Sequence, residues 1–81
     1  MTMKKIIFLE HSLERMEKRE ITQELIIATL NSPNSIILNN ENRKIAQRFI
    51  DGKLIRVIYE EEMEKIIVVT AYKTSKIGKY I

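Results

Sequence analysis

The chain has 81 residues, of which 44% are hydrophobic and 31% charged, and its formal net charge is +3 at pH 7. This length and composition predict one folded domain, which we expect to span residues 1–81, and exclude a disordered chain. With no cysteine and one histidine, disulfides and thiolate metal sites are excluded, and a zinc site is not expected. The mild excess of positive charge is compatible with nucleic acid or with an acidic protein partner.

No apolar run reaches the roughly 18 residues that a membrane helix needs. The two lysines before residues 6–9 weakly imitate a signal peptide, but the apolar run is too short and no small-residue cleavage site follows. We therefore expect a cytoplasmic protein with no membrane partner, no cofactor and no metal. Residues 6–9 themselves fit either a short first strand or the chain leading into the first helix.

The stretch after residue 9 predicts a helix with an ordered set of charges. At about 100° per residue, His11, Arg15 and Arg19 stand at i, i+4 and i+8, so they form one cationic row beside a narrow apolar stripe. A solvated face of mixed charge is the simpler interpretation of the same pattern. Ser12 is an alternative N-cap, and a helix that begins there would leave His11 just outside it.

A second helix is predicted after Thr22, which is a suitable N-cap, and Glu24 in the first turn favours the helix dipole. The residues from Leu25 to Leu30 are apolar around most of the circumference, which is typical of a buried helix. Pro33 ends the helix, because the residue before a proline avoids the helical region.

The rest of the chain alternates like a series of strands. Four strands are expected, over residues 35–39, 44–50, 53–60 and 65–73. Asp51-Gly52 lies between two alternating runs and strongly predicts a tight hairpin, in which Gln47 is opposite Arg56. Two helices followed by these strands predict an α+β fold, in which two N-terminal helices pack on one face of an antiparallel meander of three to four strands.

The faces of this sheet depend on the register of the last strand, since a slip of one residue exchanges them. If Glu61 pairs with Glu64 across the acidic turn, Arg48, Thr70 and Tyr72 share one surface. The other face would then meet the helices, and Arg56 would lie at the edge of the core near the cationic row. The acidic turn at residues 60–64 is interpreted as a solvated turn in preference to a metal site, which would need fixed geometry.

One motif resembles a known group of proteins. The pattern His-x-x-x-Arg-Met-x-x-Arg-x-Ile starts at His11 and ends at Ile21, and Val-Val-Thr-Ala-Tyr ends at Tyr72. Their order and spacing resemble a family of small domains of unknown function within the RelE/ParE-like toxin superfamily, over residues 11–73. Leu9 departs from the family, whose members often have serine or threonine there as the N-cap.

The resemblance implies a toxin-like endoribonuclease of a toxin–antitoxin system, which cleaves messenger RNA, often on the ribosome. The 2′-hydroxyl attacks the adjacent phosphate without a metal, so the reaction needs an acid, a base and fixed positive charge. Histidine and arginine are suited to these roles. The catalytic residues expected are His11, Arg15 and Arg56. The RNA-binding residues expected are Arg19, Arg48, Tyr72 and Lys73, with Tyr72 or Tyr80 stacking on a base.

Two other functions remain open at this point. The chain is alternatively a non-catalytic module of the same fold that binds nucleic acid or protein, or a toxin aimed at another target. A small antitoxin is the protein partner that the resemblance implies. Its acidic segment would bind the cationic row, which we favour, or it would add a strand to the edge at residues 35–39.

Overall fold

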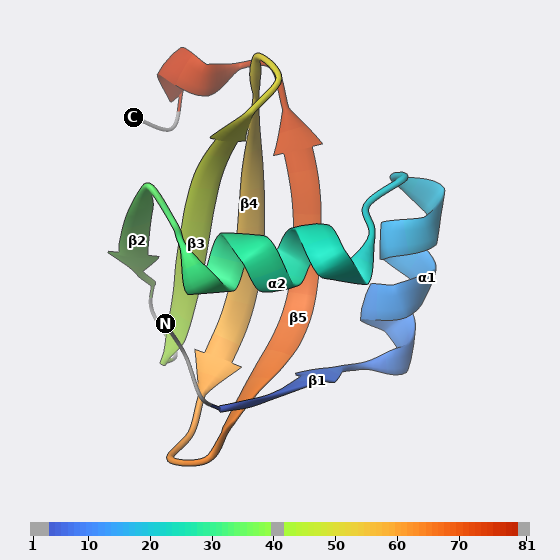
Figure 1. The fold of residues 1–81 in the computed structure, drawn as a ribbon, viewed down its shortest axis with the longest axis vertical. Helices are drawn as coiled ribbons and strands as arrows, with labels where there is room; N and C mark the ends of the chain where they lie inside the picture. Colours follow the sequence, from blue (N-terminus) through green and yellow to red (C-terminus); the bar gives the residue numbers. More distant parts are fainter. Residues whose placement is uncertain (1–3, 40–41, 80–81) are drawn as a thin grey trace.

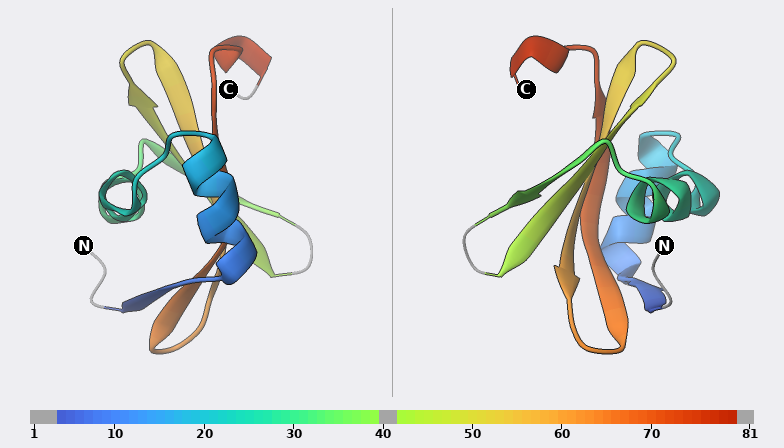
Figure 2. Two further views of the ribbon diagram at one scale, coloured as in Figure 1. Left: turned by 90° about the vertical axis from the view of Figure 1, so that its right-hand side faces the viewer. Right: turned by 60° about the vertical axis from the view of Figure 1, so that its left-hand side comes forward.

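A computed structural model describes residues 4–39 and 42–79 of the chain. Five strands form one sheet in the order β1-β5-β4-β3-β2, and both helices lie on the same side of it (Figures 1 and 2). The elements in chain order are β1 (Lys5–Phe8), α1 (Glu10–Lys18), α2 (Gln23–Asn31), β2 (Ser35–Leu38), β3 (Arg43–Ile50), β4 (Lys53–Glu61), β5 (Lys65–Thr74) and the short 3-10 helix η1 (Ile77–Lys79). No helix in the described ranges is long and apolar enough to cross a membrane.

The expected sheet, an antiparallel meander of three to four strands, is wrong, although the α+β class holds. The sheet has five strands and is mixed, because β1 runs parallel to β5, with Ile6 opposite Ile66 and Phe8 opposite Val68. Residues 6–9 are therefore mostly strand and not the approach to a helix. A parallel pair is joined by a long crossover and needs no turn of its own. The sequence consequently contains no local signal for it.

The predicted β3–β4 hairpin is confirmed. Asp51 has φ +50° and Gly52 has φ +77°, and a type I′ turn requires positive φ at both central residues. Gln47 is opposite Arg56, as expected. This turn places Lys53, the first residue of β4, beside the end of β5, where Leu54 pairs with Thr74.

The two helices begin and end at identifiable residues. The Thr22 side chain accepts a hydrogen bond from the Leu25 amide at 3.1 Å, which confirms the predicted N-cap of α2. Helix α1 begins after Leu9, which provides no side-chain cap, so His11 lies inside the helix. At the other end of α1, Glu20 has φ +57° and the Ile21 amide donates to the Met16 carbonyl at 2.9 Å. This is the bonding pattern of a Schellman motif, which turns the chain sharply after the helix.

The helices cover the face of the sheet opposite to the one expected. Apolar residues of β4 that pack in the core with the helices are Ile55, Val57 and Tyr59. Strand β4 also has apolar residues at Leu54 and Ile58, so its alternation does not distinguish the faces. A bulge in the β4–β5 pairing at residues 58 and 59 changes the register further. We call the face with Leu54 and Ile58 the open face, because the two helices do not cover it, although Leu54 itself is fully buried.

Side chains of α1 cover the outer edge of β5 where β1 ends. The Ser12 hydroxyl, which is fully buried, donates to the Val68 carbonyl at 2.9 Å. The Arg19 guanidinium donates to the Ala71 carbonyl at 2.8 Å. These bonds satisfy carbonyl groups at the edge of the strand, where an added strand would otherwise bind. They also fix the end of α1 beside the last residues of β5.

Candidate nucleic-acid interface

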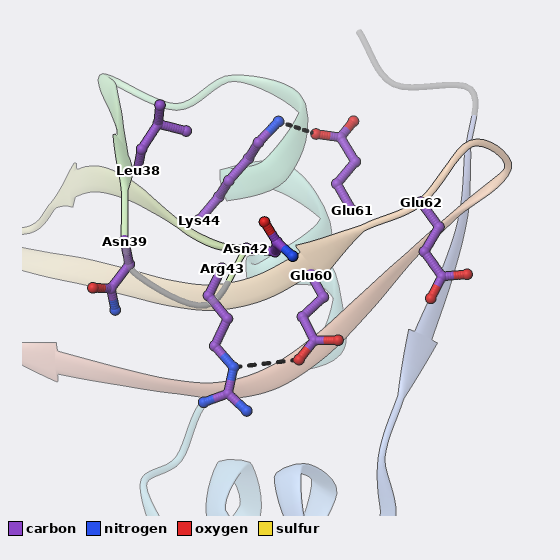
Figure 3. Close-up of a pocket in the computed structure, with 8 residues that line it drawn as sticks. All are labelled: Leu38, Asn39, Asn42, Arg43, Lys44, Glu60, Glu61 and Glu62. Carbon is purple, nitrogen blue, oxygen red and sulfur yellow. Dashed lines mark hydrogen bonds and ion pairs between the residues drawn. The ribbon is translucent and has the colours of Figure 1, made fainter.

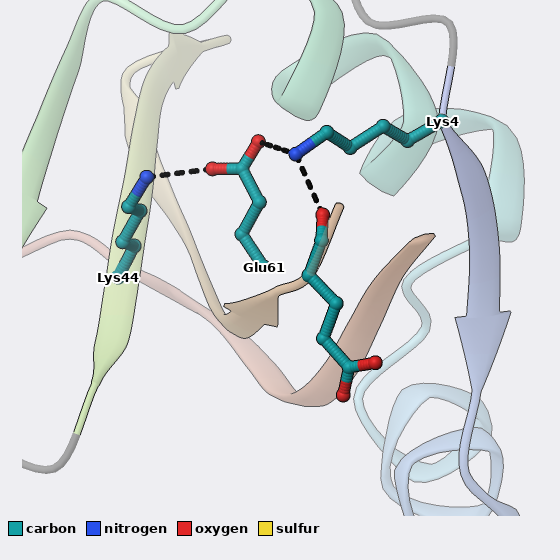
Figure 4. Close-up of polar contacts among 4 residues, drawn as sticks. Lys4, Lys44 and Glu61 are labelled. Carbon is teal, nitrogen blue, oxygen red and sulfur yellow. Dashed lines mark hydrogen bonds and ion pairs between the residues drawn. The ribbon is translucent and has the colours of Figure 1, made fainter. Parts of the chain in front are cut away.

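Among the described residues, four ion pairs surround the turn between β4 and β5, and we call this region the paired end. Figure 3 draws the pairs of Arg43 and Lys44, and Figure 4 draws those of Lys4 and Lys44. The pairs, by nitrogen–oxygen distance, are Lys4–Glu61 at 2.7 Å, Lys44–Glu61 at 2.6 Å, Arg43–Glu60 at 3.3 Å and Lys65–Glu62 at 3.5 Å. A pocket of about 520 Å³ opens beside them, between the end of β2 and these carboxylates. Its positive and negative side chains largely neutralise one another.

Glu61 is at the centre of the paired end, between two lysines (Figure 4). Hydrogen bonds from Lys4 first and then Lys44 lower the pKa of the Glu61 carboxyl below its ordinary value of 4.5. The hydrogen bond to Glu61 in turn raises the pKa of Lys44 above its ordinary value of 10.5. Both shifts favour the charged forms, so the pair is ionised across the physiological range.

The acidic turn is therefore more than the solvated turn that we expected. Its carboxylates are bound by cations from β3, from β5 and from the residue before β1. Sequence distance conceals this arrangement, because Lys4 and Glu61 are 57 residues apart. Among residues 4–39 and 42–79, no group of three or more His, Asp or Glu side chains could hold a metal ion.

A second pocket, of about 470 Å³, lies where β5 ends and β4 begins, and we call it the basic pocket. The residues that line it are Arg19, Glu20, Lys53, Tyr72 and Lys73. Arg19 and Glu20 directly follow α1, Lys53 is the first residue of β4, and Tyr72 and Lys73 are near the end of β5. Three of the five side chains are cationic and one is anionic, so the pocket has a net positive charge.

Two of the three cations of the basic pocket are held by neutral oxygens. The Arg19 Nη1 group donates to the Ala71 carbonyl and, at 3.3 Å, to the Thr70 hydroxyl. The Lys73 ammonium donates to the Glu20 carbonyl at 3.4 Å. Within the described part of the chain, neither these two side chains nor Lys53 forms an ion pair. Arg19 and Lys73 are thus ordered by the fold, and no carboxylate among the described residues neutralises any of the three cations, which suits an anionic ligand.

Three of the four predicted RNA-binding residues line the basic pocket, namely Arg19, Tyr72 and Lys73. Arg48 lies elsewhere: it is on the helix-covered face and donates to the Ala28 carbonyl, near the end of α2, at 3.1 Å. Sequence reasoning missed Lys53, because it follows directly on the turn and its neighbour across the sheet depended on an unknown register. The other tyrosine proposed for stacking, Tyr80, lies outside the described residues.

The structure does not bring the three predicted catalytic residues together. His11 and Arg15 are exposed on α1, in the same row as Arg19. Arg56 is on the open face of β4, where its guanidinium donates to the Gln47 side chain at 2.7 Å and to the Tyr72 hydroxyl. Arg56 is therefore in contact with Tyr72 on the face of the sheet away from the helices, and not beside the row.

Comparison with known proteins identifies a family but no function. A family model described as "Domain of unknown function (DUF4258)" matches residues 8–73. That range includes α1 and every residue that lines the basic pocket. No curated protein and no solved structure matches the chain at a significant level.

Proposed function

Because the chain belongs to the DUF4258 family of domains of unknown function, its activity has to be inferred from its own surface, and we propose that it binds single-stranded RNA at the basic pocket. The observation that supports this is the set of cations Arg19, Lys53 and Lys73, which form no ion pair within the described ranges. Phosphate oxygens are suitable partners for guanidinium and ammonium groups. The resemblance to RelE/ParE-like toxins favours RNA as the source of the phosphate.

Tyr72 favours a single strand over a duplex. It lines the same pocket as the cations, and an aromatic ring beside a phosphate site stacks on an unpaired base. In an RNA duplex the bases are stacked on one another and do not reach such a ring. The pocket therefore combines positive charge for the backbone with a surface for a base.

The salt dependence of binding tests this proposal. A fluorescently labelled RNA of eight nucleotides is titrated with the protein at several salt concentrations, and anisotropy gives the affinity. Three phosphate contacts predict that log K falls against log[salt] with a slope of about −2, since each contact to a single strand contributes about −0.7. Absence of binding, or an affinity that does not change with salt, would contradict the proposal.

The second candidate function is RNA cleavage, and it is favoured by the position of His11 and Arg15. Both are exposed on α1 and continue the row that starts at Arg19 in the pocket. RNA bound at Arg19 would extend along the helix past them. In the reaction, the 2′-hydroxyl loses a proton to a base and attacks phosphorus, a 2′,3′-cyclic phosphate forms, and the 5′-oxygen leaves and takes up a proton.

Cleavage and growth assays distinguish an endoribonuclease from a domain that only binds RNA. If the domain is an endoribonuclease, the pure protein cuts RNA, its expression arrests growth of a host, and His11→Ala and Arg15→Ala remove both effects while the RNA still binds. Lys5→Ala, which removes an exposed cation from β1, is the matched control and should have no effect. Binding by the wild type without cleavage would identify a non-catalytic module.

We also propose that a small antitoxin covers the same surface. An acidic segment would place carboxylates where RNA phosphates bind, from the basic pocket along the row on α1. The exposed edge strand β2 is the alternative surface. Binding to the first surface predicts that the antitoxin competes with RNA and that its affinity falls with salt. Simultaneous binding of both, with no dependence on salt, would instead favour β2.

A further inference from the structure

A row of four polar side chains crosses the open face of the sheet. Ser35 of β2 is opposite Gln47 of β3, Gln47 is opposite Arg56 of β4, and Arg56 is opposite Tyr72 of β5. Each is hydrogen-bonded to the next. The Gln47 amide donates to the Ser35 hydroxyl at 3.0 Å, and the Arg56 Nε group donates to the Gln47 carbonyl oxygen at 2.7 Å. The Arg56 Nη1 group donates to the Tyr72 hydroxyl.

The middle of this row is buried, which fixes its geometry. Gln47 is 2% exposed and Arg56 is 9% exposed. Breaking a hydrogen bond of a buried polar group destabilises the folded state, because water does not replace the lost partner. The Gln47 amide has one orientation that serves both neighbours, with its oxygen toward Arg56 and its nitrogen toward Ser35. Arg56 is consequently held in one conformation.

Arg56 in turn holds the ring of Tyr72 in two ways. It donates to the hydroxyl, and its guanidinium carbon lies over the ring, 5.7 Å from the ring centre. The planar guanidinium makes both contacts at once, which a lysine ammonium does not reproduce. Tyr72 lines the basic pocket, whereas Arg56 does not. Arg56 thus acts on the pocket through another side chain.

We propose that Arg56 is a positioning residue, which holds the ring of Tyr72 on the open face beside the basic pocket, so that an unpaired nucleobase of an RNA whose backbone lies in the pocket stacks on it. This inference depends on the proposed RNA binding and adds the part of the ligand that Tyr72 recognises. It separates two contributions to affinity. Arg19, Lys53 and Lys73 bind the backbone, and the Tyr72 ring, held by Arg56, binds a base.

The two contributions are measured with two ligands of equal charge. One is an RNA of eight nucleotides, and the other is an abasic strand with the same number of phosphates. Stacking of one base is expected to make the wild type bind the RNA roughly tenfold more tightly than the abasic strand. Lys73→Gln should lower the affinity for both ligands by the same factor and leave the ratio of the two affinities unchanged.

Variants of Arg56 and Tyr72 should change the ratio of the two affinities and leave the affinity for the abasic strand nearly unchanged. In Arg56→Gln the ratio is expected to fall from about ten toward one, while the affinity for the abasic strand changes less than about twofold. Tyr72→Leu should do the same, and the double variant should add nothing further. Tyr72→Phe keeps the ring and removes the acceptor for Arg56, so it should also lower the ratio.

Each possible result decides a separate point. Wild-type protein that binds neither ligand contradicts the proposed function itself. Wild-type protein that binds both ligands equally contradicts only base recognition by Tyr72. If circular dichroism shows that Arg56→Gln does not fold, Tyr72→Phe decides in its place. A folded Arg56→Gln variant with the full tenfold ratio would overturn the role of Arg56, and a folded Tyr72→Phe variant with the full ratio would overturn the role of its hydrogen bond to Tyr72.

Discussion

The two ends of the sheet have similar numbers of cations but differ in what surrounds them. At the paired end, Lys4, Arg43, Lys44 and Lys65 each lie within 4.0 Å of a carboxylate. In the basic pocket, the three cations are bound to carbonyl and hydroxyl oxygens or to no described partner. The chain's net charge of +3 does not reveal this difference. Whether a cation can bind a ligand depends on its neighbours in the fold, which the net charge of the chain does not describe.

Cross-strand neighbours explain part of the contrast. Arg43 is opposite Glu60 in the β3–β4 pair, so strand register alone brings opposite charges together. Lys73 is opposite Ile55 in the β4–β5 pair, and its neighbour is neutral. The basic pocket has one carboxylate among its lining residues, Glu20, and the hydrogen bond from Lys73 goes to its backbone carbonyl.

The largest predicted effect is on RNA binding. Lys53→Gln combined with Lys73→Gln should weaken binding of a short single strand by roughly 100-fold, because each hydrogen bond to a charged group contributes about 1.5 kcal/mol or more. The slope of log K against log[salt] should become less steep by about 1.4. Anisotropy titrations at several salt concentrations measure both quantities.

The matched control is Arg43→Gln combined with Lys65→Gln, which removes the same charge from the paired end. Both residues form ion pairs with exposed or half-exposed side chains. Their loss should change RNA affinity less than about threefold, through the long-range potential only. Equal losses in the two double variants would show that net charge, and not the basic pocket, determines binding.

The next effect concerns the hairpin that positions Lys53. Gly52→Val should lower the free energy of unfolding by about 2 kcal/mol, because a β-branched residue is strained at φ +77°. No atom lies within 4 Å of the position of an added Cβ, so the cost comes from the backbone alone. Gly52→Asn, which tolerates this region, should cost much less. Urea denaturation of both variants measures the difference, and equal losses would refute the explanation.

A smaller effect is expected for Arg48, which the resemblance predicts to bind RNA but which donates to the Ala28 carbonyl on the helix-covered face. Arg48→Ala should lower the free energy of unfolding by about 1.5 kcal/mol, because it removes a charged hydrogen bond to the Ala28 carbonyl near the end of α2. RNA affinity should stay within about twofold of the wild type. A large loss of affinity in a protein of unchanged stability would restore Arg48 to the RNA-binding surface.

The smallest effect is at the paired end and depends on pH. Glu61→Gln should lower the free energy of unfolding at pH 7 by about 0.5–1 kcal/mol, the range of partly exposed ion pairs. The folded state lowers the pKa of Glu61 below 4.5, so this stabilisation is complete above 4.5 and is lost as the pH falls through the folded-state pKa. Denaturation curves of the two proteins should therefore converge in acid. A difference that persists there would not come from the ion pairs.

The features predicted correctly from the sequence are local ones. The Asp51-Gly52 hairpin and the Thr22 cap depend on residues that are close in sequence, and turn chemistry and capping identify them directly. The pairing of Gln47 with Arg56 follows from the same turn. Arg19, Tyr72 and Lys73 line one pocket, but their role in RNA binding stays a prediction.

The features that were missed depend on long-range pairing. No tight turn joins β1 to β5, so the sequence gives no local signal for their parallel pairing. Strand β4 has apolar residues on both faces, so its sequence does not show which face meets the helices. The error in the faces placed Arg56 beside the α1 row, when it lies on the other side of the sheet in contact with Tyr72. Predicting that Lys53 lines the basic pocket requires the register of β4 and β5, which the sequence does not provide.

The central claim is that RNA binds at the basic pocket and not at the paired end, and chemical-shift mapping tests it most directly. A ¹⁵N-labelled sample is titrated with an RNA of eight nucleotides, and amide shifts are followed residue by residue. Binding at the basic pocket predicts that the largest shifts are at Arg19, Lys53, Tyr72 and Lys73, with little change at residues 43, 44 and 60–62. Shifts centred on those residues, or on the edge strand β2, would contradict the claim.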